Sequence, residues 1–479
     1  LAATFAPIAP AIWPDEASVW TSSREITAVR ETSDAVWAAT TGGVLRLENG
    51  AQTQWSARDG LPANDVFAVQ TAPEIAVNTF RGAAKWDGKS WRKTEFSPQI
   101  LRWRGHEIGF SPDDLRWNGQ KFALPPSSKG THITGAVPDG EAIRIAVFGE
   151  GFWLFDGQGW RFDGENLPPE NAREITALAP RMGAQIVFGT RRNGVWRGAN
   201  RSWRPISSHD DEPHIANVQS FARFRGALFA STLDDGIVFR SGQNWCHVAA
   251  PTLSSTAARH LVSFGEKLWV RHGTGVVDSF DGTVWRRNDL RPPRAGVYAL
   301  DADEKRLAAA GWGGFALFDG QNWAPFYDLP ALKGVPIVGI SLDGDAVWLL
   351  TQSRGLMRFS GGEITVFDER NGFQDDWITA FARSGNERFA GTFVGGLHRF
   401  DGQKWVPFAA TRGENITALA PIPNGVLAAS RSGLWRVQNG EIERVSRAEI
   451  EPELQAILVE NERVFLGGRT SFASLPTIP

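Results

Sequence analysis

The chain has 479 residues, 50 basic and 53 acidic side chains, and a formal net charge of −3. Its charges are well mixed, without the long basic stripe that nucleic acid or a membrane surface would favour. A single cysteine, Cys246, excludes an internal disulfide framework and a cysteine-based zinc site. No apolar run reaches the roughly 18 residues needed to span a bilayer, so no transmembrane segment is expected.

The chain begins without methionine, and residues 1–14 are rich in alanine and proline. A removed signal peptide or a trimmed boundary would explain this start, and we expect the segment to be an exposed arm. From residue 25 onward, short runs rich in apolar residues recur, such as 25–29, 35–40 and 44–47, and apolar and polar residues alternate in many of the runs. This period of two predicts β-strands throughout, and no segment has a sustained helical period.

A short signature, an aromatic residue followed by Asp-Gly-x-x-Trp, recurs along almost the whole chain. It occupies residues 86–91, 155–160, 280–285, 318–323 and 400–405, with looser copies at 117–122 and 239–245. Because Asp-Gly and Asn-Gly favour positive φ at both central turn positions, each copy predicts a tight β-hairpin. A hairpin repeated at a nearly fixed period indicates a repeat architecture.

The hairpins belong to about twelve units of four strands, and such a unit is one blade of a β-propeller. Twelve blades exceed the four to eight of a typical ring, so two tandem rings are favoured over one large ring. The linker-like segment 247–255 suggests a boundary between residues 1–250 and 251–479, with a seven-plus-five division and a single ring left open. The last unit has only three strands, and we expect residues 17–21 to supply its fourth.

Two further motifs resemble those of a known family. Residues 59–66 read Asp-Gly-Leu-Pro-Ala-Asn-Asp-Val, with weaker copies at 163–171 and 370–376. The Gly-Thr steps at 189–190 and 391–392 are each followed by a Gly-Val or Gly-Leu pair. On these motifs nearly the entire chain resembles the two-component regulator propeller family. The resemblance implies a β-propeller in the periplasm or outside the cell of a bacterium, whereas the lack of a transmembrane helix or kinase departs from the family's sensor pattern.

In a propeller, the turns between second and third strands share one face with the connections between blades. Arginine at loop tips suits carboxylate, phosphate or protein contact. Simple solvation of these loops is the alternative interpretation. The residues predicted to form a ligand- or partner-binding face are Arg81, Arg191, Arg192, Arg271, Trp312, Arg354, Phe393 and Arg431.

No catalytic or metal-binding motif stands out. Residues 209–214 are the densest group of His, Asp and Glu, but their spacing matches no established metal motif. Cys246 and His247 are adjacent on a predicted strand, so they point to opposite faces and do not favour a dyad. With no nucleophile elbow or phosphate loop, we expect no catalytic residue, no metal site and no cofactor.

These patterns favour a non-catalytic binding or scaffold protein that recognises another protein or an extended ligand through a propeller face. One alternative is a propeller enzyme, a lyase or hydrolase with its site at the mouth of a central channel. Another is the sensor part of a split signalling system. His, Arg and carboxylate side chains converging at one mouth would favour the enzyme.

Overall fold

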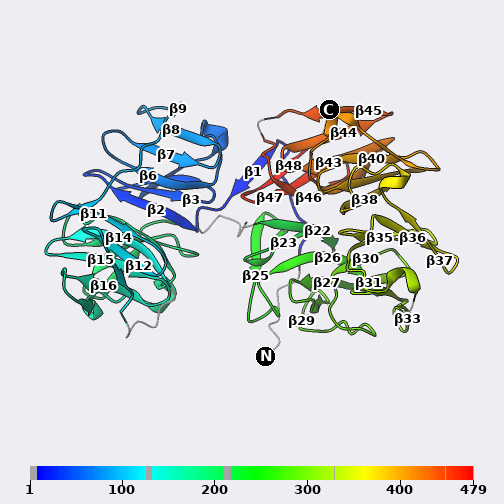
Figure 1. Cartoon of the computed structure of the whole chain (residues 1–479), viewed down its shortest axis with the longest axis horizontal. Coiled ribbons are helices and arrows are strands. Elements are labelled where there is room, and N and C mark those ends of the chain that lie inside the picture. The colour runs from blue at the N-terminus through cyan, green and yellow to red at the C-terminus, as the bar shows by residue number, and fades with distance from the viewer. Residues whose placement is uncertain are drawn as a thin grey trace. The chain divides into compact units, whose positions relative to one another are not determined.

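Short antiparallel strands joined by tight turns make up almost all of the computed structural model, which describes residues 8–125, 132–208, 215, 217–327, 329–447 and 449–477 (Figure 1). The strands form twelve four-stranded sheets, and the predicted all-β propeller fold with about twelve blades is confirmed. No helix in the described ranges is long and apolar enough to cross a membrane. The short 3-10 turns are η1 (Ala57–Asp59), η2 (Gly164–Asn166), η3 (Glu170–Ala172), η4 (Pro330–Leu332), η5 (Glu369–Asn371) and η6 (Ala409–Thr411).

Five sheets are each built from four consecutive strands near the start of the chain. Their strands are β2 (Ile26–Glu31), β3 (Val36–Thr40), β4 (Gly43–Glu48), β5 (Ala51–Trp55); β6 (Val66–Gln70), β7 (Ala76–Thr79), β8 (Gly82–Trp86), β9 (Trp91–Thr94); β10 (Arg102–Trp103), β11 (His106–Phe110), β12 (Asp114–Trp117), β13 (Gln120–Ala123); β14 (Ile133–Asp139), β15 (Ala142–Val147), β16 (Gly151–Phe155), β17 (Trp160–Phe162); β18 (Ile175–Leu178), β19 (Ile186–Thr190), β20 (Val195–Ala199) and β21 (Ser202–Pro205).

Six further sheets follow the same consecutive order, and the seventh combines the two ends of the chain. Their strands are β22 (Val218–Phe224), β23 (Ala227–Thr232), β24 (Gly236–Ser241), β25 (Asn244–Val248); β26 (Ala258–Phe264), β27 (Lys267–His272), β28 (Val277–Phe280), β29 (Trp285–Arg286); β30 (Ala299–Ala302), β31 (Leu307–Gly311), β32 (Gly314–Phe318), β33 (Trp323–Phe326); β34 (Ile337–Asp343), β35 (Ala346–Thr351), β36 (Leu356–Ser360), β37 (Glu363–Phe367); β38 (Ile378–Ser384), β39 (Glu387–Thr392), β40 (Leu397–Phe400), β41 (Trp405–Pro407); β42 (Ile416–Ile422), β43 (Gly425–Ser430), β44 (Gly433–Gln438), β45 (Glu441–Val445); and β46 (Leu454–Glu460), β47 (Arg463–Gly468), β48 (Ser471–Leu475) with β1 (Ser18–Thr21).

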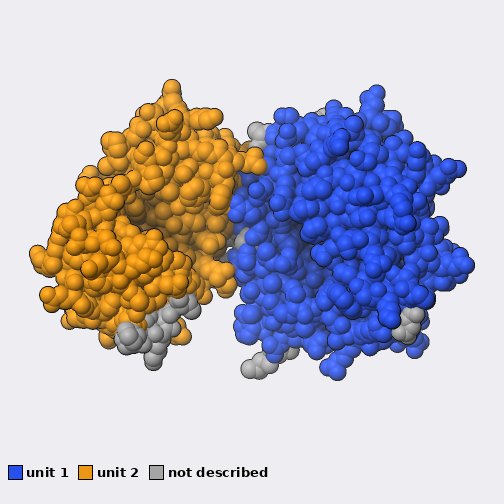
Figure 2. Space-filling model, in the orientation of Figure 1, with its two compact units in different colours: residues 1–20, 213–479 blue, residues 21–212 orange. Residues whose placement is uncertain are grey.

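The blades group into two compact units (Figure 2). Thr21–Glu212 contains the five sheets from β2 to β21, whereas Leu1–Trp20 and Pro213–Pro479 contain the other seven. In sequence, the five-bladed ring is therefore inserted into the seven-bladed ring. This division differs from the expected boundary at residues 250 and 251, because β22 packs against both β26 and β46 and so belongs to the larger ring. The segment 247–255 only joins two neighbouring blades of that ring.

The Asp-Gly signature joins the third and fourth strands of a blade through a four-residue loop. Phe155 of β16 pairs with Trp160 of β17, which leaves residues 156–159 in the loop. Only Gly157 has a positive φ, of 102°. The Asp156 side chain instead accepts two backbone N–H groups of the loop, at 2.9 and 2.8 Å. The aspartate therefore holds the turn by hydrogen bonding.

The expectation of positive φ at both central positions is consequently wrong for the Asp-Gly copies, although the predicted hairpins form. It is met at the looser copy, where Asn118 has a φ of 50° and Gly119 a φ of 72°. There Trp117 pairs directly with Gln120, so the loop has two residues. The other looser copy also has a two-residue loop, because Ser241 pairs with Asn244, but there only Gly242 has a positive φ, of 58°. These two arrangements match the two favoured two-residue hairpin turns, whereas the four-residue loop has a positive φ only at its first glycine.

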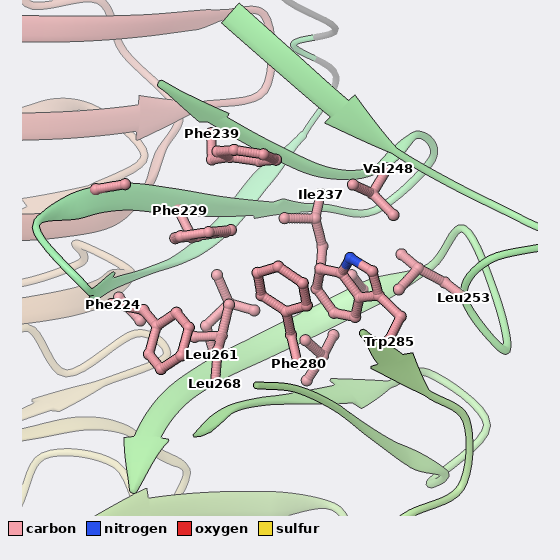
Figure 3. Close-up of a cluster of buried hydrophobic side chains, with 14 residues drawn as sticks. Phe224, Phe229, Ile237, Phe239, Val248, Leu253, Leu261, Leu268, Phe280 and Trp285 are labelled. Atoms are coloured by element: carbon pink, nitrogen blue, oxygen red, sulfur yellow. The ribbon is translucent and has the colours of Figure 1, made fainter. Parts of the chain in front are cut away.

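Apolar side chains fill the space between neighbouring blades. Between the blades that begin with β22 and β26, Phe229 stacks on Phe239 with ring centroids 4.5 Å apart (Figure 3). Phe280 stacks in the same way on Trp285, the last residue of a hairpin signature, also at 4.5 Å. The signature's two aromatic positions therefore face each other across the hairpin and contribute to the core.

The first strand of several blades begins with the step Ile-Thr-Ala, where the ladder register shifts at the threonine. This bulge threonine bridges to the next blade. The Thr417 hydroxyl donates to the Leu454 carbonyl at 2.7 Å, and the Thr176 hydroxyl donates to the Ile26 carbonyl. The bulge thus joins blades near the centre of each ring.

The seven-bladed ring is completed by the N-terminus. Strand β1 is the outer strand of the sheet ordered β1-β48-β47-β46, the position expected for residues 17–21. The described part of the preceding segment is exposed at Ala9, Pro10, Ile12 and Pro14, as composition suggested, but it lies against the ring. Ile12 donates its backbone N–H to Gly242 at 2.8 Å, and Trp13 packs edge-on against Trp20 and Trp245 at 6.0 Å. Aromatic burial of this kind holds the arm against the ring.

Candidate functional site

A threonine at the end of the second strand shapes the turns on the predicted face. The Thr351 hydroxyl donates to the Gly355 carbonyl at 2.8 Å and accepts the Arg354 N–H at 2.9 Å. Equivalent bonds connect Thr190 with Gly194 and its neighbour in the five-bladed ring. These bonds leave the side chains at the tip of each turn free to point outward.

Backbone hydrogen bonds tie the same turns to the connections between blades. Gly355 donates to Asp376 at 3.0 Å, and Gly313 donates to Val335 at 2.8 Å. In the five-bladed ring, Arg191 donates to the carbonyl of Glu174, just before β18, at 2.9 Å. Within each ring, these turns and connections therefore lie on one face.

The predicted residues divide between the two rings. Arg81, Arg191 and Arg192 belong to the five-bladed ring, whereas Arg271, Trp312, Arg354, Phe393 and Arg431 belong to the seven-bladed ring. The arginines at turn tips are exposed, except that Arg192 is half-buried and lies 3.8 Å from Glu174. Each ring thus carries its own group of candidates, and Arg271 and Phe393 are placed differently from the rest.

Phe393 is not a free tip, because its ring stacks on Trp377 at 4.2 Å with an interplanar angle of 12°. Its neighbour Val394 is 53% exposed instead. Arg271 lies within strand β27 rather than in a turn, and its side chain lines the centre of the ring. The two residues do not occupy the position of Arg354, because Arg271 precedes the last residue of its strand and Phe393 directly follows it, whereas Arg354 lies three residues after Thr351.

A small pocket lies beside the exposed side chain of Trp312, which is 59% exposed. The pocket encloses about 190 Å³ and includes Arg294 and Tyr327 in its wall. The Arg294 guanidinium lies 4.5 Å from the Tyr327 ring centroid, a cation–π distance. An indole, a phenol and a guanidinium thus meet at one concave spot on the turn face of the seven-bladed ring.

The centre of the seven-bladed ring holds a cavity of about 380 Å³. Polar side chains from several blades line it, including Gln219, His260, Arg271, Asp301 and Gln455. Burial, assisted by the nearby charge of Arg271, lowers the pKa of His260 to about 4, so the His260 imidazole is neutral at pH 7. Burial also raises the pKa of Asp301 to about 6, against the opposing effect of the Leu342 N–H bonded to it at 2.7 Å.

The five-bladed ring has a central cavity of about 420 Å³ with a different lining. Apolar residues such as Ile100 and Phe110 contribute to it, together with Arg30. Burial lowers the pKa of Arg30, and its guanidinium donates to the Val29 carbonyl at 2.9 Å. The lining also includes Glu107 and Gln99, so this cavity combines one cationic and one anionic group with polar and apolar walls.

The buried polar cluster nearest to a catalytic arrangement has the wrong order of groups. Asp278 lies between its partners, with its carboxylate 2.8 Å from His272 Nε2 and 2.6 Å from the donating Ser254 hydroxyl. A hydrolytic triad needs the imidazole between serine and carboxylate. His272 and Asp278 are also fully buried, so this cluster is structural.

Neither Cys246 nor a cluster of metal ligands among the described residues supports a reactive site. Burial raises the pKa of the Cys246 thiol, which disfavours the thiolate. No group of three or more potential metal ligands occurs among the residues that the structure describes. The His- and Asp-rich segment 209–214 lies outside the described residues.

Comparison with known proteins supports the fold and leaves the family open. No protein-family model matches the chain, and no curated protein matches it in sequence. PorZ, a surface component of the type-IX secretion system of Porphyromonas gingivalis, is 12% identical with a TM-score of 0.65, over 96% of this chain and 87% of PorZ. The GH74 enzyme of Niastella koreensis is also 12% identical, with a TM-score of 0.51, over 93% and 80%.

A third structure is the extracellular domain assigned to the one-component system BT4673 of B. thetaiotaomicron. It is 16% identical with a TM-score of 0.47, over 94% of this chain and 69% of that chain. All these identities are low, so the matches show a propeller-like fold alone. A surface component and a GH74 enzyme share that fold, and function has to be argued from the sites.

Apart from Arg271, the residues around the central cavity of the seven-bladed ring were not predicted, because the predicted residues were chosen from the turns between second and third strands. The available signal is the residue at the bulge threonine position. Gln219, Arg259, Tyr298 and Gln455 replace that threonine in four blades of this ring. A polar or aromatic side chain there faces the mouth of the channel instead of only bridging blades.

Proposed function

We propose that this chain is a non-catalytic binding protein that acts outside the cytoplasm. It recognises another protein or an extended ligand through the turn face of the seven-bladed ring. The observation that carries this proposal is Trp312, exposed beside the pocket formed with Arg294 and Tyr327. Trp, Tyr and Arg are the residues that most often dominate binding energy at interfaces.

The remaining predicted residues of this ring extend the proposed surface. Arg354 and Arg431 are exposed at the turns of two other blades, and Val394 is exposed beside the Trp377–Phe393 stack. An aromatic anchor with arginines on neighbouring blades suits a partner that spans several blades. The extracytoplasmic location rests on the fold similarity to a bacterial surface component.

The test is co-purification from the native source with wild-type bait and with a Trp312→Ala bait. We expect the variant to remain folded and to lose the partner recovered by the wild type. Gln321→Ala is the matched control, because Gln321 is exposed on an Asp-Gly hairpin of the same blade. Retention of the partner by Trp312→Ala, with loss by Gln321→Ala, would refute the assignment of this face.

One observation favours an enzyme as a second candidate. His260, Arg271 and Asp301 line the same cavity, which is the convergence expected at a propeller active site. Two properties weaken it as an acid–base site. His260, with a pKa of about 4, is a weak base at neutral pH, and one oxygen of Asp301 is engaged by the Leu342 N–H. The binding function is therefore better supported.

A further inference from the structure

One arginine lines the central cavity of the seven-bladed ring, and a second lies beside it, bonded to the lining residue Gln219. Arg271 lines the wall from β27, and Arg259 is exposed on β26 next to it. The Arg259 guanidinium donates to Gln219 at 3.3 Å, and Arg271 donates only to the His272 carbonyl at 3.4 Å. Within the described part of the chain, neither forms an ion pair, although twenty-two Arg or Lys ion pairs occur elsewhere, so a specific reason for these two unpaired cations is required.

The Arg271 guanidinium is largely withdrawn from solvent and has spare donors. Its Nε has no hydrogen-bond partner. Burial, with a contribution from the like charge of Arg259, lowers the pKa of Arg271 to about 10, so it remains charged at pH 7. A buried cation with unused donors is costly unless an anion pairs with it.

The other charges around the cavity limit the anion to a single charge. Arg259 and Arg271 contribute two positive charges, Asp301 is mostly ionised at pH 7, and His260 is neutral. The net charge facing the cavity is therefore about one positive unit. A monoanion balances this charge, whereas a dianion would be repelled by Asp301.

The rest of the lining offers hydrogen bonds to hydroxyl groups. Gln219 and Gln455 line it from two blades; Gln219 donates to Gln455, and Gln455 donates to Asn217 at 3.2 Å. Because an amide oxygen can accept two hydrogen bonds, each glutamine oxygen keeps capacity for a ligand hydroxyl. A volume of about 380 Å³ lies within the range of small-molecule pockets. These donors and acceptors surround the cavity, so a polar ligand is favoured over an apolar one.

We propose that this cavity binds a small hydroxylated monocarboxylate, with its carboxylate on Arg271 and Arg259 and its hydroxyls on the glutamines. The planar guanidinium matches a carboxylate bidentately, which explains arginine at both positions. This site is separate from the Trp312 pocket: the two share no lining residue. The chain would thus carry a small-molecule site in addition to its proposed docking face.

The test is calorimetric titration of the full chain with sodium glucuronate, with glucose and inorganic phosphate as comparison ligands. We expect saturable binding of glucuronate, weaker binding of phosphate, and none of glucose. Arg271→Gln should weaken glucuronate binding about tenfold or more, because a hydrogen bond to a charged group is lost. Arg259→Gln should weaken it less, since Arg259 is exposed.

Arg287→Gln is the control, because Arg287 is an exposed arginine of the same ring outside the lining of both pockets. It should bind glucuronate as the wild type does. The proposal is overturned if folded wild-type protein shows no saturable binding of glucuronate in the millimolar range, if glucose binds equally, or if phosphate binds more tightly. It is also overturned if Arg259→Gln and Arg271→Gln both bind glucuronate unchanged. Trp312→Ala should bind glucuronate normally, which separates this outcome from failure of the docking face.

Discussion

The five-bladed and seven-bladed rings use the same blade but join their first and last blades differently. In the seven-bladed ring, β1 from the N-terminus pairs with β48 near the C-terminus, so one sheet contains both ends of the ring. In the five-bladed ring, every blade is made of four consecutive strands. Main-chain strand pairing therefore closes one ring, whereas contacts between complete blades close the other.

The closing junction of the five-bladed ring is a collection of local contacts. Gln52 and Ser208 exchange two hydrogen bonds of 2.9 Å, and Arg197 pairs with Glu31 at 2.5 Å. Ile26 and its apolar neighbours on β2 to β4 pack against residues of β18 to β20. Such a junction resembles any other contact between blades, so it can open without disrupting a sheet.

The closing junction of the seven-bladed ring adds aromatic packing to strand pairing. Trp13 and Trp20 from the N-terminal segment contact Trp245 of β25 and Phe472 of β48. The Arg240 guanidinium lies within cation–π distance of all three indoles, at 5.1 to 5.6 Å. We therefore expect the two rings to respond differently when their junctions are weakened.

Deletion of residues 1–20 should have the largest effect. It removes most of β1 and two packed indoles, and truncation of a buried tryptophan alone costs about 3–5 kcal/mol. The unfolding midpoint of the seven-bladed unit should fall by on the order of 10 °C, since each kcal/mol shifts it by about 2–4 °C. Hydrogen exchange resolved by peptide should show faster exchange in β46 to β48 and little change in β2 to β21.

A chain lacking only residues 1–7 is the control for this deletion. It should unfold like the full chain. If the longer deletion destabilises the five-bladed unit as strongly as the seven-bladed one, the two closures are not independent.

Glycine substitutions at equivalent junctions should have an intermediate effect. A Cβ on Gly189 would lie 2.2 Å from Ile26 Cγ2 at the closing junction of the five-bladed ring, and one on Gly467 would lie 2.4 Å from Val218 Cγ1 in the seven-bladed ring. Gly189→Ala and Gly467→Ala should each cost about 1–3 kcal/mol by overpacking. Denaturant titration measures these costs.

Only Gly189→Ala should open its ring, because the five-bladed ring has no strand that plays the part of β1 in completing the last blade. Gly391→Ala, where the Cβ would lie 2.5 Å from Ile416 Cγ2, is the control for an interior junction. Local hydrogen exchange at β2 and β18 distinguishes opening from uniform destabilisation. Equal opening at β22 and β47 in Gly467→Ala would show that β1 does not secure the larger ring.

Loss of a bulge threonine hydroxyl should have the smallest effect. Thr176→Val removes the hydrogen bond to Ile26 at the five-bladed closure, and Thr417→Val removes the bond to Leu454 inside the seven-bladed ring. Each should cost about 0.5–1.5 kcal/mol in the free energy of unfolding. An unchanged free energy in both variants would mean that these hydroxyls do not stabilise the contact between blades.

The candidate sites show how far turn positions alone can predict function. A hydroxyl side chain, Thr351 or Ser430, holds the turns that carry Arg354 and Arg431, and the recurrence of this turn made both arginines predictable as exposed residues of one face. Arg271 reaches the cavity, with Arg259 beside it, only because β26 and β27 are neighbours at the centre of a closed ring. Their proximity depends on ring closure, which no local pattern encodes.

The sequence by itself determined the blade: its strands have a period of two, its hairpins carry Asp-Gly, and its last unit lacks a strand that residues 18–21 supply. The strand period and the hairpins depend on residues close together in the chain, and the missing strand follows from comparing the last unit with the others. Only the tertiary structure decided that the blades divide into five and seven, and that Trp13 holds the N-terminal segment against the larger ring. Every blade has the same local pattern, so ring size depends on which distant first strand packs against which last blade. Close side-chain packing decides which blades pack together: Ile26 packs on Gly189, and Val218 packs on Gly467.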